Sequence, residues 1–126
     1  MASVNEICDA EKLRAFIASN KLTLVFLYER NRRGGEYLSR LVEHIAWRLE
    51  PAIRVVHVDV GCAKELEDMF GSAPRVALFI DGVKTWEQIG FFYSSTVDKK
   101  AISRGILHAL RSRGLKPSQL GLRLDL

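Results

Sequence analysis

Three arginines stand close together in one short polar stretch of the chain, Arg30 to Gly35. The guanidinium groups of Arg30, Arg32 and Arg33 could hold a phosphate, an acidic peptide or a nucleic-acid backbone. The helix predicted after them adds free backbone amides and a dipole that favours anions. The alternative is a solvated loop in which the arginines pair with neighbouring glutamates.

The other residue types that carry chemistry exclude several kinds of site. Gly34 and Gly35 belong to neither a G-x-G-x-x-G fingerprint nor a P-loop, which excludes nucleotide binding by those routes. The two cysteines, Cys8 and Cys62, are too few and too far apart for a zinc site or a disulfide-dense scaffold. The histidines match no metal-binding spacing, so we expect neither a metal nor a cofactor.

The composition is that of a single folded domain. Of the 126 residues, 48% are hydrophobic and 27% are charged, which excludes a disordered chain. The longest apolar run, Leu22 to Tyr28, is too short to cross a bilayer, and the first residues do not resemble a signal peptide. We therefore expect a cytoplasmic protein without a membrane partner. Scarce amide side chains and an excess of Arg over Lys hint at a thermophilic source.

Hydrophobic periodicity predicts the elements that must position these residues. Asp9 is a good N-cap for the first helix, Pro51 ends the second, and Asp81-Gly82 is a hairpin turn. The helices are expected after Asp9, after Gly35, over 63–70 and from a start at Thr96 or Asp98. The strands are expected over 4–8, 22–29, 53–60, 75–80 and 83–92. The order along the chain is β-α-β-α-β-α-β-β-α, which limits the topology to parallel crossovers followed by an antiparallel hairpin.

This order of elements resembles the thioredoxin fold over roughly residues 4 to 113. The most specific match is the segment SAPRVALFIDG, residues 72–82. It looks like the thioredoxin segment in which a cis-proline precedes the fourth strand and a turn with glycine follows it. Pro74 stands at the cis-proline position, and Gly90 matches the glycine that ends the fifth strand. The resemblance implies an α/β domain over residues 1–114, with a central mixed sheet flanked by helices.

One departure from the thioredoxin pattern changes the implied function. The window that carries Trp-Cys-x-x-Cys in thioredoxins reads Arg30-Asn31-Arg32-Arg33-Gly34 here. Both cysteine positions are lost, so dithiol–disulfide exchange at the usual site is excluded. The resemblance then implies a redox-inactive protein-binding or assembly module, chaperone-like rather than enzymatic.

The resemblance also implies a binding groove for this module. Its walls would be Ala73, Pro74, the 30–34 window, Gly90 and Phe91. The backbone of Ala73 would pair with a protein or peptide partner. The arginines of the window would select acidic groups on that partner.

The resemblance places the two cysteines near each other, because the first and third strands of a thioredoxin fold are adjacent and parallel. A disulfide between Cys8 and Cys62 would close a loop of about 54 residues and stabilise the fold by about 4 kcal/mol. The favoured expectation is nevertheless two unlinked, half-buried thiols, and a single reactive Cys62 is a third alternative. The competing function is therefore a divergent thiol oxidoreductase that uses Cys62 or the Cys8/Cys62 pair. An anion or nucleic-acid binder built on the arginines is a further function class.

The last residues, 115–126, form an extension outside the shared fold. Four leucines alternate with other residues from Leu120 to Leu126, which is the period of an amphipathic strand. Such a strand needs an apolar surface to bury its leucines. We expect it to dock on its own domain or to form a homodimer.

Overall fold

A computed structural model of the chain describes residues 4–62 and 64–126. Its elements follow one another in the predicted order, and Ala63, the first residue of the predicted third helix, lies outside the described residues. The helices are α1 (Ala10–Ser19), α2 (Gly35–Leu49), α3 (Glu65–Phe70) and α4 (Ser95–Ser112). The strands are β1 (Asn5–Ile7), β2 (Leu22–Tyr28), β3 (Arg54–Asp59), β4 (Arg75–Ile80) and β5 (Val83–Ile89).

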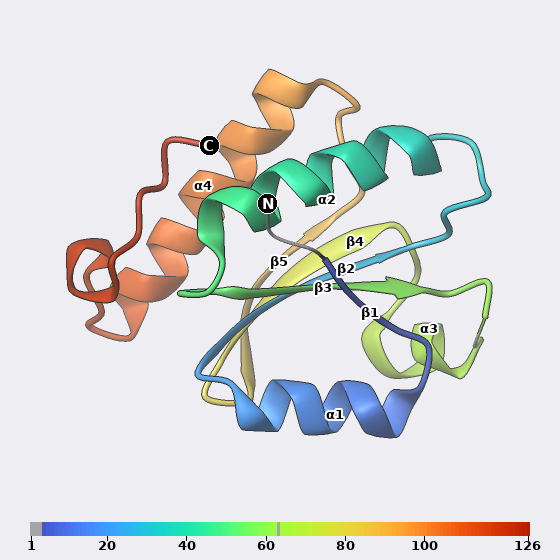
Figure 1. The fold of residues 1–126 in the computed structure, drawn as a ribbon, viewed down its shortest axis with the longest axis horizontal. Coiled ribbons are helices and arrows are strands. Elements are labelled where there is room, and N and C mark those ends of the chain that lie inside the picture. The colour runs from blue at the N-terminus through green and yellow to red at the C-terminus, as the bar shows by residue number, and fades with distance from the viewer. Residues whose placement is uncertain (1–3, 63) are drawn as a thin grey trace.

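The strands form one mixed sheet in the order β1-β3-β2-β4-β5, drawn in Figure 1. β3 pairs in parallel with both β1 and β2, whereas β4 runs antiparallel to β2 and to β5. All seven residues of β2 are buried, as expected for the central strand of a sheet covered on both faces. The carboxyl ends of β1, β2 and β3 consequently lie at the same end of the sheet as the start of β4.

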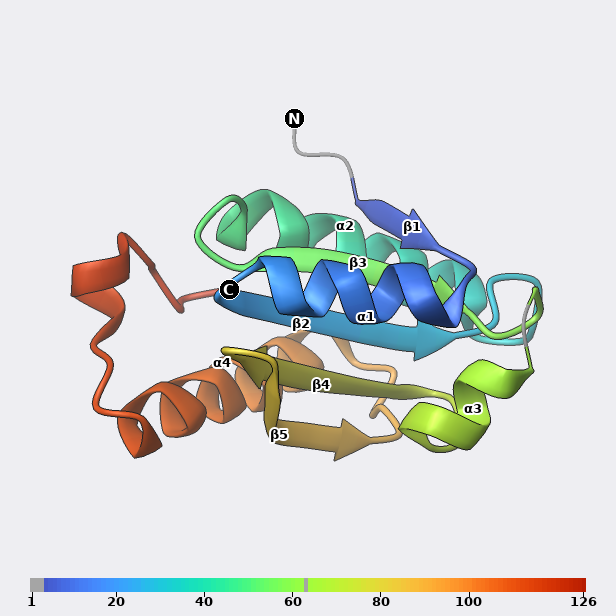
Figure 2. The same cartoon turned by 90° about the horizontal axis from the view of Figure 1, so that it is seen from below.

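Helices cover both faces of the sheet, as Figure 2 shows from another side. The larger core cluster joins α2 and α4 to one face, and the smaller cluster joins α1 and α3 to the other. Alternate residues of β2 serve the two clusters: Phe26 and Tyr28 face α2, and Val25 and Leu27 face α1. The fold is thus the predicted α/β arrangement of a mixed sheet between two helical layers.

Local sequence explains where several of these elements begin and end. The Asp9 side chain accepts hydrogen bonds from the backbone N–H groups of Glu11 and Lys12, which confirms its predicted capping role at α1. The turn between β4 and β5 uses Asp81 and Gly82, both with positive φ, as a type I′ hairpin requires.

The extension after α4 packs on the chain's own core but adds no strand to the sheet. Pro117–Leu120 form a short 3-10 helix, and Gly121 reverses the chain at a φ of 70°. Leu122 is then buried in the larger core cluster, while Leu120, Leu124 and Leu126 pack against it half-buried. The alternation of leucines therefore reflects the burial of one side of an extended segment. The predicted pairing of this segment as a strand is absent from the sheet formed by the described residues.

Among the described residues, none of the helices combines the length and apolarity that a bilayer crossing requires.

Candidate functional site

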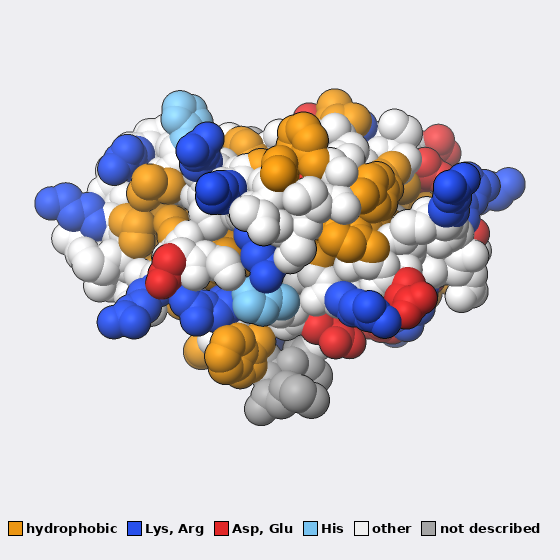
Figure 3. All heavy atoms as spheres, turned by 90° about the horizontal axis from the view of Figure 1, so that it is seen from above, with side chains coloured by type: hydrophobic (Ala, Val, Ile, Leu, Met, Phe, Trp, Pro, Cys, Tyr) orange, Lys and Arg blue, Asp and Glu red, His pale blue; other side chains and the backbone are white. Residues whose placement is uncertain are grey.

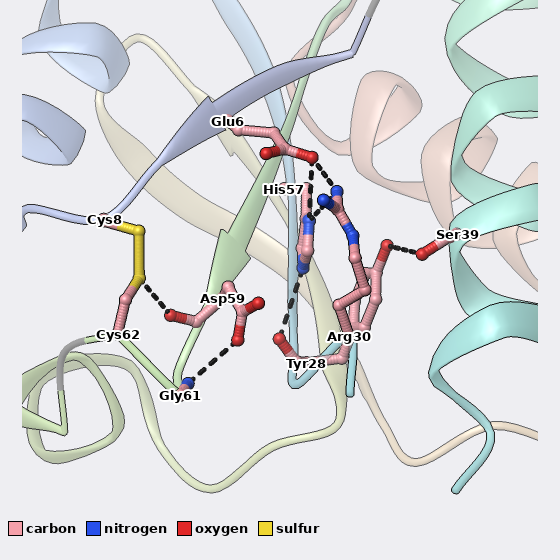
Figure 4. A network of polar contacts seen from close by, with 9 residues as sticks. All are labelled: Glu6, Cys8, Tyr28, Arg30, Ser39, His57, Asp59, Gly61 and Cys62. Carbon is pink, nitrogen blue, oxygen red and sulfur yellow. Dashed lines mark hydrogen bonds and ion pairs between the residues drawn. A yellow bond between two sulfur atoms is a disulfide. The ribbon is translucent and has the colours of Figure 1, made fainter. Parts of the chain in front are cut away.

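A disulfide joins Cys8 to Cys62 at one end of the sheet (Figure 4). Cys8 directly follows β1, and Cys62 closes the turn that follows β3. Because β1 and β3 are parallel with Ile7 opposite Val58, the chain after each strand leaves the sheet at the same place. The two Cα atoms lie 5.9 Å apart across a sequence separation of 54 residues. Both cysteines are exposed, and within the described residues neither sulfur is a free thiol, so the expectation of two unlinked, half-buried thiols is wrong.

A tight turn of four residues holds Cys62 in place. The Asp59 carboxylate accepts a hydrogen bond of 2.9 Å from the Gly61 N–H, and the Asp59 carbonyl accepts one of 3.2 Å from the Cys62 N–H. The same carbonyl oxygen lies 2.9 Å from Cys62 Sγ. A bridged sulfur has no proton to donate, so this contact becomes an S–H hydrogen bond only once the bridge is reduced.

A polar cluster of Glu6, Arg30 and His57 lies beside the bridge on the α2 face of the sheet (Figure 4). Arg30 forms an ion pair with Glu6, and its Nη2 lies 3.3 Å from His57 Nδ1. Because arginine only donates hydrogen bonds, His57 Nδ1 must accept this one. The ring proton therefore sits on Nε2, which faces the Tyr28 carbonyl at 3.3 Å.

The cluster rests on a buried aromatic pair. The rings of Tyr28 and His57 stack with centroids 3.8 Å apart, and the Tyr28 hydroxyl lies 3.0 Å from Ser39 Oγ. Burial lowers the pKa of His57, and the Arg30 charge lowers it further; burial also raises the pKa of Tyr28. His57 is therefore a neutral hydrogen-bonding base at neutral pH, and the only net charges of the cluster are those of the Glu6–Arg30 pair.

The structure brings together only part of the predicted groove. The Ala73–Pro74 peptide bond is cis, and both residues line a cavity of about 350 Å³ together with Arg32, Arg33 and Tyr93. The cavity reaches Val60, two residues before Cys62. The Ala73 N–H donates to the chain's own Glu67 carboxylate at 3.0 Å.

The other predicted groove residues serve the fold. The Gly90 N–H donates to the Pro74 carbonyl at 2.9 Å, and Gly90 has the positive φ of a residue that ends a strand. Phe91 turns inward and stacks on Phe26, with ring centroids 6.3 Å apart. Gly34 caps α2 with a positive φ against the Tyr93 ring, and Asn31 is exposed in the loop before it.

The three arginines of the loop do not converge on one point. Arg30 is engaged with Glu6 and His57, and Arg32 pairs with Glu29 at 2.8 Å. Arg33 is exposed and forms no ion pair among the described residues. The geometry accordingly resembles the paired-loop alternative more than a prepared anion site. Likewise, residues 4–62 and 64–126 contain no cluster of three or more His, Cys, Asp or Glu side chains that could hold a metal ion.

Comparison with known proteins identifies the fold. The chain matches no protein-family model and no curated protein sequence. Among solved structures it is similar to oxidised thioredoxin from Plasmodium falciparum, with a TM-score of 0.69, 16% identity, and coverage of 81% of this chain and 97% of that one. A mutant thioredoxin from Halobacterium salinarum gives a TM-score of 0.66 at 22% identity, covering 83% and 95% of the two chains. Oxidised mitochondrial thioredoxin 3 from Saccharomyces cerevisiae gives 0.65 at 17%, covering 80% and 94%.

These findings correct the expectation of a redox-inactive module. That expectation followed from the missing cysteines of the 30–34 window alone. The chain nevertheless carries a bridged cysteine pair, Cys8–Cys62, at the strand ends where the window lies, on a fold shared with thioredoxins. The chain therefore has the thioredoxin fold, with its cysteine pair at the ends of β1 and β3 rather than before α2.

Proposed function

We propose that the chain is a thiol–disulfide oxidoreductase whose reacting groups are Cys8 and Cys62. The observation that carries the proposal is the exposed bridge between them at the carboxyl ends of two adjacent parallel strands. A bridge open to solvent can meet the thiolate of another molecule, whereas a buried one cannot. The likeness to thioredoxins supports the same chemistry by analogy of fold only.

The reaction moves two electrons from a substrate dithiol to the bridge. A substrate thiolate attacks one bridge sulfur, the Cys8–Cys62 bond breaks, and its electron pair leaves on the other sulfur. The second substrate thiolate then attacks the mixed disulfide, forms the substrate's own disulfide, and releases the second cysteine. The two substrate protons pass through water to the two cysteine sulfurs. A small disulfide such as oxidised glutathione restores the bridge by the reverse steps.

The surroundings of the two sulfurs favour attack at Cys62. The Asp59 carbonyl, 2.9 Å from Cys62 Sγ, is an acceptor that favours a protonated thiol over a thiolate there. Cys8 has no such acceptor among the described contacts, and it lies one residue before the N-cap of α1, where the helix dipole favours a thiolate. Cys8 is therefore the better leaving group, and the mixed disulfide forms on Cys62.

The test uses the full chain and its two serine variants. Oxidised protein is supplied with a reduced dithiol peptide and with oxidised glutathione, and formation of the peptide disulfide is followed over time. We expect turnover above the protein-free rate, and its loss in both Cys8→Ser and Cys62→Ser. Mass spectrometry should find a mixed disulfide between Cys62 and glutathione accumulating in Cys8→Ser, because Cys62 can displace one glutathione from oxidised glutathione but no Cys8 thiol is present to displace the other.

The double variant Cys8→Ser/Cys62→Ser is the control for background reactions. Turnover that persists in it would contradict the proposal. A bridge that reduced glutathione attacks no faster than an unstructured peptide disulfide would contradict it as well.

A further inference from the structure

One face of α4, far along the chain from the bridge, carries an unusual concentration of cations. Thr96, Lys99, Lys100, Ser103 and Arg104 are spaced i, i+3, i+4, i+7 and i+8. On a helix this spacing places them side by side along about 12 Å. Three positive charges and two hydroxyl groups therefore share one strip of surface.

These cations are not neutralised by the chain's own acids. Within the part of the chain that the structure describes, Lys99, Lys100 and Arg104 make no ion pair. The acidic residue that lines the same cavity, Asp125, has its carboxylate 3.2 Å from Arg48 Nη2, which also donates to the Asp125 backbone carbonyl at 3.0 Å. The strip consequently retains a net positive charge that an anion could satisfy.

The extension after α4 supplies an apolar wall opposite this strip. Leu124 and Leu126 line, with the strip, a cavity of about 480 Å³. This volume lies within the roughly 300–1,000 Å³ of small-molecule sites. Figure 3 shows this face: in its left half, Lys and Arg side chains border hydrophobic ones, and acidic side chains gather mainly in the right half.

We propose that this cavity binds an amphipathic organic anion, an alkyl carboxylate, with its head on the cations of α4 and its chain against the leucines. The charge selects an anion, and the two leucines select one with an apolar body. A nucleic-acid backbone would use the cations but would leave the leucine wall without a partner. The site is independent of the proposed redox function, since none of its residues contacts Cys8 or Cys62.

Calorimetric titration of the full chain with decanoate, below its micelle-forming concentration, tests the proposal. We expect one saturable site that acetate does not fill and that decyltrimethylammonium, with the same alkyl chain and a cationic head, does not fill. Adding salt should weaken decanoate binding, because the contacts are between partly exposed charges.

Matched variants separate the site from general charge. Lys99→Gln/Lys100→Gln/Arg104→Gln should weaken decanoate binding about tenfold or more, as expected for three partly exposed contacts. Lys12→Gln/Arg14→Gln/Lys21→Gln removes the same charge from the α1 side of the sheet and should leave binding unchanged. Cys8→Ser/Cys62→Ser should also bind decanoate normally.

Three results would overturn the proposal. Equal binding of acetate and decanoate would show that the leucines do not contribute to binding. Equal binding of the cationic amphiphile would show that the cations of α4 do not select an anion. Binding of single-stranded DNA to this face without any binding of decanoate would assign the cations to nucleic acid instead.

Discussion

At the scale of single residues, His57 is an imidazole held neutral inside a strand. Its side chain is 2% exposed, its Nδ1 faces Arg30, and its Nε2 donates to Tyr28. Burial of the ring disfavours its charged form, and protonation would also place a charge on Nδ1 against the guanidinium. The pKa of His57 therefore lies below its ordinary value of 6.5 in the folded chain.

This lowered pKa predicts that folding stability falls as the pH drops below 6.5. Between the folded and unfolded pKa values, the unfolded chain binds the proton and the folded chain does not. The free energy of unfolding should therefore decrease by up to about 1.4 kcal/mol per pH unit across that interval. Urea unfolding of the wild type and of His57→Gln between pH 7.5 and 5 measures this slope.

The exposed His108 provides the matched control for this prediction, and His108→Gln should keep the wild-type slope. If His57→Gln keeps that slope as well, the histidine is not the group that titrates.

Sequence reasoning could find some residues of the candidate site but not their grouping. The thioredoxin resemblance placed Pro74 and suggested that Cys8 and Cys62 approach each other. It could not find the Glu6–Arg30–His57 cluster, because that contact depends on how far the 30–35 loop folds back over the edge strand. Glutamates closer along the chain were the expected partners of the three loop arginines. Only Arg32 pairs with one of them, Glu29.

At the scale of elements, α4 lies on β5 through one close approach. Gly105 is buried with no side chain, and the Trp86 ring occupies the space where a Cβ would stand. Glycine is needed here for its lack of a side chain and not for its backbone freedom. The same contact packs the half-buried Trp86 side chain of β5 against α4.

Gly105→Ala should therefore destabilise the chain by about 1–3 kcal/mol, because the added methyl group forces the indole or the helix to move. The intrinsic helix preference of alanine, worth about 1 kcal/mol, acts in the opposite direction and will not offset the clash. Urea unfolding monitored by far-UV circular dichroism measures the change. The control is Arg111→Ala, an exposed position on the same helix; an equally stable Gly105→Ala would show that the two elements separate without cost.

Hydrophobic periodicity predicted an element correctly where the buried side chains belong to a regular helix or to a paired strand. It was less reliable where side chains are buried without such backbone pairing. The all-buried β2 and the capped α1 follow directly from their residues. The terminal leucines show the limit: a period of two records that alternate side chains are buried, whereas a strand also needs a free sheet edge beside it. Pro117 and Gly121 turn the segment over the helical layer, where leucines find apolar contacts but no ladder.

At the scale of the whole molecule, the bridge ties the edge strand β1 to the interior of the sheet. β1 has only three residues and one neighbouring strand, so it depends on few backbone hydrogen bonds. This arrangement also explains why the redox-inactive expectation was wrong. Spacing along the chain identifies a Cys-x-x-Cys pair, but a pair 54 residues apart becomes adjacent only through the parallel pairing of β1 with β3.

Reduction of the bridge should lower the free energy of unfolding by about 4 kcal/mol in the chain-entropy model for a loop of this length. The measurement compares urea midpoints of the oxidised chain and of the same chain in excess reductant. Cys8→Ala/Cys62→Ala should unfold at one midpoint whether or not reductant is present. Equal midpoints for the oxidised and reduced wild type would contradict a stabilising role for the bridge.

The long separation of the two cysteines also couples electron uptake to folding through a thermodynamic cycle. In this cycle, the free energy by which the bridge stabilises the folded chain equals the free energy by which folding stabilises the bridge against reduction. A contribution of about 4 kcal/mol makes the native pair roughly 90 mV harder to reduce than the same pair in the unfolded chain. In denaturant that unfolds the reduced chain but not the oxidised one, reduction and unfolding become a single step, and the midpoint potential rises with denaturant concentration.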